Sequence, residues 1–201
     1  MMVQTKNNDS RNVMPHIKPD TVGAEIGVWH GNTSSQFLKR GIKKLHLVDS
    51  WSIEPYKDDT GEHGSYQAYL DKYSRALGVL PSEESFTLHY DKVYNIVREK
   101  FSKDERVEIH RMTSDEWFES YTGEPLDWIY IDGAHSFEGC FADLNNALKI
   151  VKPGGKIIGD DYYWPFAKWG KKGVTEAVDK FLRDNSFEKT REGMTQFVIE
   201  V

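Results

Sequence analysis

Acidic residues follow two predicted strands in the second half of the chain, and a histidine lies close behind one of them. The first strand ends on Asp132, and a glycine turn then leads to His135, in the stretch WIYIDGAHSFEGC. The second strand ends on Asp160 and Asp161, in KIIGDD. A carboxylate in such a position can cap a helix, bind a metal or act in catalysis. A histidine can act as a general base near neutral pH without strong tuning of its pKa.

Three carboxylates at the ends of neighbouring strands repel one another unless a positive charge lies between them. A hard divalent cation, Mg²⁺ in particular, prefers oxygen ligands and lowers the pKa of a bound hydroxyl. We therefore predict a metal site at Asp132, Asp160 and Asp161. Taken alone, Asp132 could equally cap a helix, and Asp160 with Asp161 could be a strand-ending turn.

A second group of residues surrounds two glycines in the first half of the chain. The stretch AEIGVWHGNTS places Glu25, Gly27 and Gly31 between a predicted strand and a predicted helix. Glycine allows close approach of a ligand and positive φ. The spacing E-x-G-x-x-x-G departs from the dinucleotide fingerprint G-x-G-x-x-G, which disfavours NAD. Asp49 ends the next strand and could accept both hydroxyls of a ribose, and Trp51 could pack on an adenine.

Regular elements must bring these residues together. The hydrophobic pattern predicts strands over 21–28, 44–49, 106–110, 126–132 and 156–161, followed by two closing strands in FEKT and TQFVIEV. Helices are expected from a Thr33/Ser34 cap to Arg40, from TSDEW onward, over 137–151 and over 174–182, with KPGG (152–155) as a turn. This alternation predicts an α/β fold with a mostly parallel sheet, helices on both faces and ligands beyond the carboxyl ends of the strands.

Two segments depart from the alternation. Residues 1–20 are polar with two prolines, and we expect a flexible N-terminal arm ahead of a single domain over 21–201. Residues 52–104 are expected to form an insertion on the substrate side, with helices near 66–77 and 93–101. Aromatic rings here and after the fifth strand could hold a sugar or a phenol, or could pack a lid and a subunit contact. They are Tyr56, Tyr66, Tyr69, Tyr73, Tyr162, Tyr163, Trp164, Phe166 and Trp169.

The composition limits the classes of partner. The 201 residues carry a formal net charge of -6, which argues against nucleic acid. Cys140 is the only cysteine, so we expect a reducing cytoplasm, and we find no signal peptide or membrane-spanning run. His63, His89 and His110 lack ligand spacing and are interpreted as background. A homodimer is expected.

The glycine motif, Asp49 and the KPGG turn occur in the order found in class I S-adenosylmethionine-dependent methyltransferases. The chain resembles this family from about Val22 to its C-terminus, with the insertion excluded. The resemblance implies a Rossmann-like, seven-stranded sheet. It places the methionine part of the cofactor at the glycine loop and the adenine next to the residues after the third strand. The cofactor contacts so implied are Glu25, Gly27, Gly31, Asp49, Trp51, Thr113, Ser114 and Asp132.

IDGAHSFEG followed by GDDY is similar to the metal-dependent small-molecule O-methyltransferases, of the catechol type and the macrocin-type sugar branch. In that family an aspartate after the fourth strand and an acidic pair after the fifth hold the ion, which implies Asp132, Asp160 and Asp161 as metal ligands. His135 occupies the position of the catechol-type lysine base, which implies that it removes the substrate proton. It could instead orient the substrate or cap the helix that begins at Ser136.

The function implied is S-adenosylmethionine-dependent, Mg²⁺-assisted O-methylation of a hydroxyl on a small molecule such as a sugar, a phenol or a polyketide. Two alternatives stay open. One is a non-catalytic S-adenosylmethionine-binding or assembly module, against which the intact acidic set argues. The other is a nicotinamide-dependent oxidoreductase, which the missing third glycine disfavours.

Overall fold

The computed structural model describes residues 12–58, 65–162, 173–192 and 195–201. Its strands are β1 (Val22–Ile26), β2 (Lys44–Asp49), β3 (Val107–Arg111), β4 (Leu126–Ile131), β5 (Val151–Gly159), β6 (Lys189–Glu192) and β7 (Gln196–Glu200). Its helices are α1 (Asn32–Leu38), α2 (Pro55–Asp58), α3 (Tyr66–Leu77), α4 (Glu83–Phe101), α5 (Ser114–Ser120), α6 (Phe137–Ile150) and α7 (Gly173–Asn185), preceded by a short 3₁₀ turn at Met14–His16.

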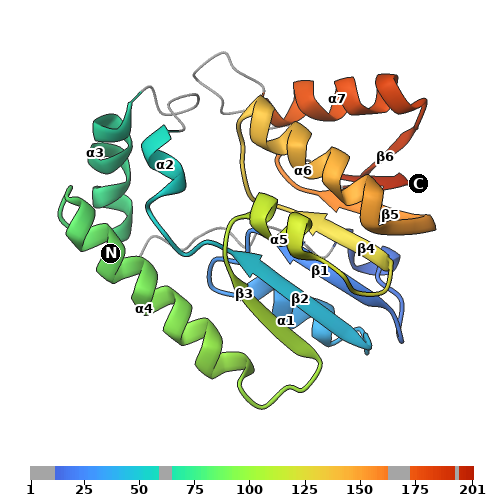
Figure 1. Ribbon diagram of the computed structural model, residues 1–201, viewed down its shortest axis with the longest axis horizontal. Helices are drawn as coiled ribbons and strands as arrows, with labels where there is room; N and C mark the ends of the chain where they lie inside the picture. The colour runs from blue at the N-terminus through green and yellow to red at the C-terminus, as the bar shows by residue number, and fades with distance from the viewer. Residues whose placement is uncertain (1–11, 59–64, 163–172, 193–194) are drawn as a thin grey trace.

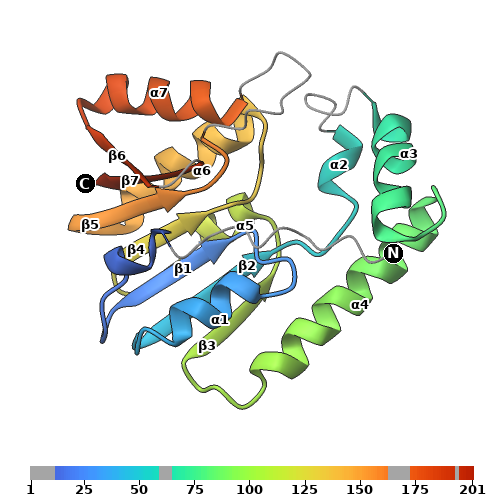
Figure 2. The ribbon, with the colours of Figure 1, turned by 180° about the vertical axis from the view of Figure 1, so that it is seen from behind.

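All seven strands belong to one sheet, in the order β3-β2-β1-β4-β5-β7-β6 (Figure 1). The pairs among β1 to β5 are parallel, whereas β7 is antiparallel to both of its neighbours. Seen from both sides, the helices flank the sheet (Figure 2). Of the insertion, α2 and α3 lie beyond the end of β2, and α4 runs from there back toward the start of β3 (Figure 2). The predicted Rossmann-like α/β fold with a seven-stranded, mostly parallel sheet is confirmed.

Alternating side chains bury both faces of the sheet. On β4, Ile129 and Ile131 belong to the core that α5, α6 and α7 cover, while Trp128 and Tyr130 belong to the core formed with α1, α3 and α4. This pattern follows from the two-residue period of a strand. Because both faces are packed, the strands have little freedom to shift in register.

The register aligns the carboxyl ends of the central strands. Ile26 of β1 lies opposite Val48 of β2 and Ile131 of β4, and Ile131 lies opposite Gly159 of β5. The residues that follow these positions therefore meet at one edge of the sheet. This is where parallel α/β sheets bind their ligands.

Several local details differ from the sequence-based expectation. The N-cap of α1 is Gly31 with φ 66°, not Thr33 or Ser34, because the helix already begins at Asn32. α4 begins at Glu83, capped by Ser82, and so extends well before the predicted start near 93. KPGG lies inside β5 as an irregularity, since the register passes directly from Leu126↔Val151 to Trp128↔Lys156.

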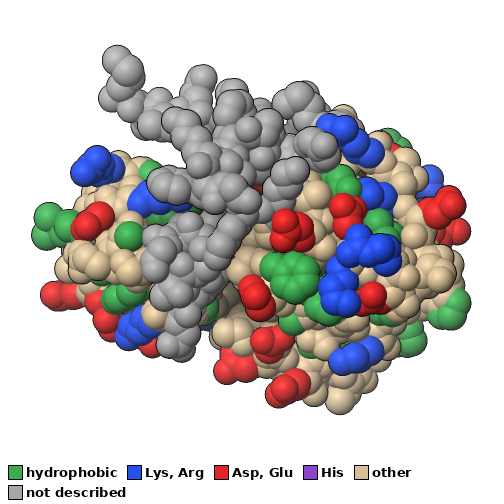
Figure 3. All heavy atoms as spheres, turned by 90° about the horizontal axis from the view of Figure 1, so that it is seen from above, with side chains coloured by type: hydrophobic (Ala, Val, Ile, Leu, Met, Phe, Trp, Pro, Cys, Tyr) green, Lys and Arg blue, Asp and Glu red, His purple; other side chains and the backbone are tan. Residues whose placement is uncertain are grey.

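The described end of the predicted arm packs on the domain. Val13 and Ile17 are fully buried in the core with α1, so residues 12–20 are not loose, and residues 1–11 lie outside the described residues. Among the described helices none is long and apolar enough to cross a membrane. On the face drawn in Figure 3, acidic and basic side chains of the described residues are interspersed.

Candidate functional site

Three polar side chains from the ends of β4 and β5 come together. The Nε2 atom of His135 lies 3.1 Å from Oδ2 of Asp161 and 3.7 Å from Oδ1 of Asp132. The three residues can each offer one ligand atom, all within 4.8 Å of one another, so the group could hold a metal ion. Asp161 has a φ of 58°, which costs a non-glycine residue roughly 1–2 kcal/mol. Such strain is often found at functional sites.

Asp160 is not part of this group, although the sequence predicted it as a ligand. It is 3% exposed, and its Oδ1 atom accepts hydrogen bonds from Thr195 Oγ1 at 2.5 Å and from the Asp161 amide at 2.8 Å. Its Oδ2 atom accepts hydrogen bonds from the Tyr130 hydroxyl and from Gln196 Nε2, each at 3.3 Å. Asp160 therefore links β4, β5 and β7, and His135 takes the third place beside Asp132 and Asp161.

The structure also decides which residue caps α6. Ser136 is the N-cap, and its hydroxyl accepts a hydrogen bond from the Gly139 amide at 3.2 Å. Neither Asp132 nor His135 has this role, so both side chains remain available to the polar group. Burial raises the pKa of Asp132, with a contribution from Asp160, while His135 opposes the rise. A cation at the group would relieve this penalty on the charged carboxylate.

The glycine loop passes directly against the end of β4. Gly27 has φ 84°, and a Cβ atom placed on it would lie 2.1 Å from the backbone oxygen of Asp132. Gly31 has φ 66°, and a Cβ atom there would lie 2.6 Å from the Phe101 ring. Both glycines are thus required by close packing as well as by conformation. The loop that follows β1 therefore lies next to the group of Asp132, His135 and Asp161 at the same edge of the sheet.

Asp49 holds this loop through its backbone. Its Oδ2 atom accepts hydrogen bonds from the amides of Val28 at 3.0 Å and Trp29 at 2.9 Å, and its Oδ1 atom accepts one from the Trp51 amide at 2.7 Å. Burial raises the pKa of Asp49, and these three bonds oppose the rise. A carboxylate has about four acceptor positions. Two ribose hydroxyls could therefore both bind Asp49 only if one backbone amide is released.

Glu25 and Trp51 are both buried behind the loop. Glu25 accepts a hydrogen bond from the Ser34 hydroxyl at 2.5 Å, which ties β1 to α1, and burial raises its pKa well above the usual value. Trp51 is fully buried, and its indole Nε1 donates to the Trp29 carbonyl at 2.9 Å. The structure thus gives both residues a role in fixing the loop. Their contact with a cofactor stays a prediction.

Thr113 and Ser114 follow β3 at the same edge. Thr113 caps α5 in a reciprocal pair with Glu116, in which each side chain accepts from the other's backbone amide. Burial raises the pKa of Asp143, a carboxylate on α6 that sequence reasoning missed, and Ser114 lowers it. Asp143 is 1% exposed, and its Oδ2 atom has no hydrogen-bond partner among the described residues. The sequence could have indicated that Asp143 is buried, because it lies on the same helix face as the apolar residues Cys140 and Ala147.

The tyrosines of the insertion mainly pack against one another. The rings of Tyr56 and Tyr69 stack at 4.3 Å, and the hydroxyls of Tyr69 and Tyr90 lie 2.6 Å apart. Tyr90 also meets the ring of Trp29 in the glycine loop at 5.7 Å. The insertion thus supports the loop by packing. Tyr162 is buried and donates to Asp179, while the predicted aromatic residues Tyr163, Trp164, Phe166 and Trp169 lie outside the described residues.

Residues 24–162 match the family model described as a methyltransferase domain. The chain belongs to this methyltransferase family. The matched range contains the glycine loop, Asp49, the polar group, part of β1 and all of β2 to β5. The predicted class I methyltransferase is thereby confirmed, while a search of curated proteins found no match.

Solved methyltransferase structures share the fold. The O-methyltransferase NovP has a TM-score of 0.58 and 18% identity, covering 95% of this chain and 75% of its own. The O-methyltransferase from Bacillus cereus, solved in complex with SAH, has a TM-score of 0.55 and 19% identity, covering 94% and 76%. The N-methyltransferase NodS from Bradyrhizobium japonicum WM9 has a TM-score of 0.55 and 13% identity, covering 94% and 88%. These neighbours methylate different kinds of atom, so the likeness shows the fold alone.

The contact between Gly27 and the Asp132 backbone leads to a stability prediction. Gly27→Ala should lower the free energy of unfolding by about 2–5 kcal/mol, because an unfavourable φ is combined with overlap against backbone. The matched control is Gly78→Ala, at φ 69° with nothing within 4 Å of the added Cβ, where a loss of about 1–2 kcal/mol is expected from φ alone. Urea denaturation of both variants measures the difference. Equal losses would contradict the proposed close approach.

Asp143 leads to a pH prediction. Burial raises its pKa to about 7, against near 4 in an unfolded chain. Between these values the folded state binds more protons than the unfolded state, so this residue makes stability fall as pH rises from about 4 to about 7, by up to about 4 kcal/mol. Asp143→Asn should remove that contribution, so the variant gains stability relative to the parent as pH rises. Denaturation curves at pH 5 and pH 8 test this, and a constant difference between the two proteins would refute it.

Proposed function

We propose that this methyltransferase transfers the methyl group of S-adenosylmethionine to a hydroxyl oxygen of a small molecule, assisted by a divalent cation such as Mg²⁺. One observation carries the proposal. The group of Asp132, His135 and Asp161 lies at the carboxyl ends of β4 and β5, with the backbone of Asp132 directly against Gly27. A cofactor on the glycine loop and a hydroxyl at the polar group would thus be held side by side.

In this proposal the cofactor binds along the carboxyl ends of β1, β2 and β3. Its methionine part passes the loop at Gly27 and Gly31, whose close packing against Asp132 and Phe101 sets the path of the backbone. Its ribose lies at Asp49, and its adenine borders Thr113 and Ser114. The SAH complex of the Bacillus cereus enzyme, which shares the fold, supports this choice of cofactor.

The donor set fits a divalent cation. Asp132 and Asp161 offer carboxylate oxygens, the ligands that Mg²⁺ prefers, and Asp160 adds negative charge from behind the site. When bound, such an ion would lower the pKa of the substrate hydroxyl and fix its position. The O-methyltransferases among the structural neighbours agree with oxygen as the methyl acceptor.

His135 could serve this group in two ways, as a third ligand or as a base. We assign it the role of base, because its imidazole lies beside the two carboxylates, with Nε2 3.1 Å from Oδ2 of Asp161, and a histidine can take up a proton near neutral pH. The negative charges of Asp161 and Asp132 would stabilise the resulting imidazolium. The substrate oxygen then bonds to the methyl carbon as the carbon–sulfur bond breaks, and S-adenosylhomocysteine leaves.

Replacing one ligand tests the metal. Asp161→Asn should reduce methyl transfer to a hydroxylated acceptor by about 10²-fold or more, because it removes a charge that holds the ion, while binding of S-adenosylhomocysteine is retained. Asp184→Asn, which alters a carboxylate paired with Lys180 on α7, is the control and should keep the parental rate. Initial rates with Mg²⁺ and with a chelator provide the measurement. A parental rate in Asp161→Asn would show that the reaction does not need a metal held by Asp161.

Replacing the histidine tests the base. His135→Ala should lower the rate at pH 7 by about 10²–10⁴-fold, because the substrate proton loses its acceptor. Rates are measured across pH, together with Mg²⁺ affinity by calorimetry. Unchanged Mg²⁺ affinity with a lost rate agrees with a base, and a lost Mg²⁺ affinity would make His135 a ligand instead.

Cofactor binding without transfer to any hydroxylated acceptor, in the parent itself, would favour the non-catalytic module. A homodimer and the absence of nucleic-acid binding stay predictions.

A further inference from the structure

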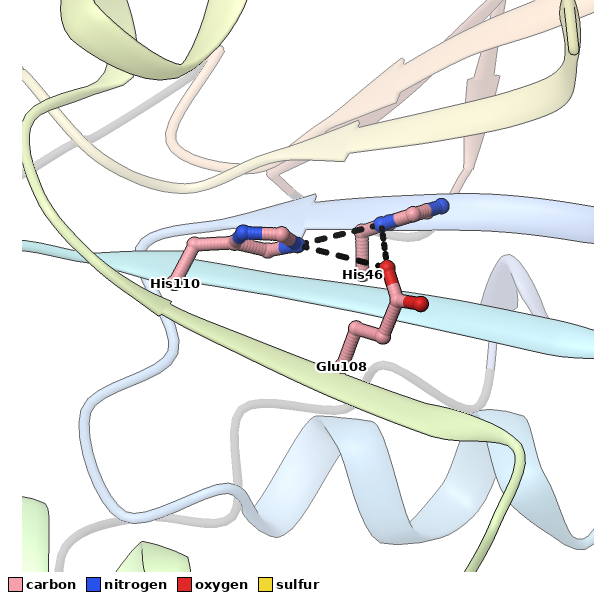
Figure 4. Close-up of side chains that lie close together, drawn as sticks. All are labelled: His46, Glu108 and His110. Carbon is pink, nitrogen blue, oxygen red and sulfur yellow. Dashed lines mark hydrogen bonds and ion pairs between the residues drawn. The ribbon is translucent and has the colours of Figure 1, made fainter. Parts of the chain in front are cut away.

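A second cluster of metal-binding side chains lies on β2 and β3. His46 on β2, with Glu108 and His110 on β3, point toward one another from neighbouring strands (Figure 4). The register explains why. His46 lies opposite Glu108, and Val48 lies opposite His110. Glu108 and His110 are two residues apart, so they share the face of the sheet on which His46 lies.

The distances within this cluster match those around a small metal ion. The Nδ1 atom of His46 lies 3.1 Å from Nε2 of His110 and 3.3 Å from Oε2 of Glu108, and the latter two atoms are 3.9 Å apart. Zn²⁺ binds imidazole nitrogen and carboxylate oxygen at about 2.0–2.2 Å in tetrahedral geometry, which separates neighbouring ligand atoms by about 3.3–3.5 Å. Only a small movement of Glu108 or His110 would be needed to complete one face of such a tetrahedron.

Neighbouring residues hold the three side chains in this arrangement. Tyr121 meets the His46 ring edge-on at 5.5 Å, and Trp117 lies 5.9 Å from His46 and 6.0 Å from His110. Lys44 binds the other carboxylate oxygen of Glu108, Oε1, at 2.7 Å, and so leaves Oε2 directed at the histidines. Such outer contacts orient metal ligands in known sites.

We propose that His46, Glu108 and His110 form a Zn²⁺ site, separate from the group of Asp132 at the ends of β4 and β5. Two nitrogens and one oxygen suit Zn²⁺ better than Mg²⁺, which prefers oxygen alone. Glu108 and His110 are partly exposed, so the ion can enter from solvent, and water can occupy the fourth position. The bound ion would fasten the edge strand β3 to β2, the strands followed by Thr113 and ended by Asp49.

The competing interpretation is a hydrogen-bonded cluster without metal, in which His46 and His110 share a proton across 3.1 Å. Zn²⁺ titration of the chelator-treated, full-length protein distinguishes the two, with competition by a chromophoric chelator. His110→Gln and Glu108→Gln are the test variants, because both side chains are partly exposed and their loss should leave the fold intact, whereas His46 is 5% exposed. Circular dichroism and thermal unfolding without metal confirm the fold of each variant.

Two controls keep the result specific. His16→Gln removes a histidine that also faces a glutamate, Glu192, at 2.9 Å but belongs to no group of three potential ligands among the described residues. Asp161→Asn removes a ligand from the other candidate group. We expect the parent and both controls to bind one equivalent of Zn²⁺ at this site, and each test variant to bind it at least about tenfold more weakly. Parental Zn²⁺ affinity in His110→Gln and Glu108→Gln, or no stoichiometric binding by the parent, would overturn the proposal.

Discussion

The Asp49 carboxylate is the constraint on which the site depends. It accepts hydrogen bonds from three backbone amides, two from the loop after β1 and one from the loop after β2. These bonds set the path of the glycine loop, and the loop can follow that path against β4 only because position 27 has no side chain. A change at Asp49 would therefore alter the loop before it altered any ribose contact. In the proposed site, the same carboxylate would shape the loop and also bind the ribose of the cofactor.

The acidic residues at the ends of β4 and β5 have different roles, one structural and the others at the polar group. Asp160 is buried and fully engaged with donors from β4, β7 and its own neighbour, so it stabilises the frame. Asp161, the next residue, is held in a left-handed conformation and faces His135. One residue thus anchors the strand end, and the adjacent one can contact substrate or metal. The sequence does not distinguish the two roles, because Asp160 and Asp161 are adjacent residues of the same type.

The sequence predicted the sheet and the edge at which the site lies, because strand periodicity and parallel crossovers constrain both strongly. It also predicted that Asp132, His135 and Asp161 lie near one another, since each follows a strand end. It could not predict the rotation of Asp160 toward Thr195 and Gln196, which depends on β7, far along the chain. It also treated His110 as background, because the pairing of His46 with Glu108 depends on the register between β2 and β3 rather than on sequence spacing.

In the proposed arrangement, the loop after β1 and the group at Asp132 form one site for a cofactor and a metal-bound hydroxyl. The most direct measurement is calorimetric titration of the full-length protein with S-adenosylhomocysteine, once with Mg²⁺ and once with a chelator. We expect binding under both conditions, because the residues expected to contact the cofactor lie mainly along β1, β2 and β3 rather than at the metal. Absence of binding under both conditions would contradict the cofactor site, and the acidic group would then need a different explanation.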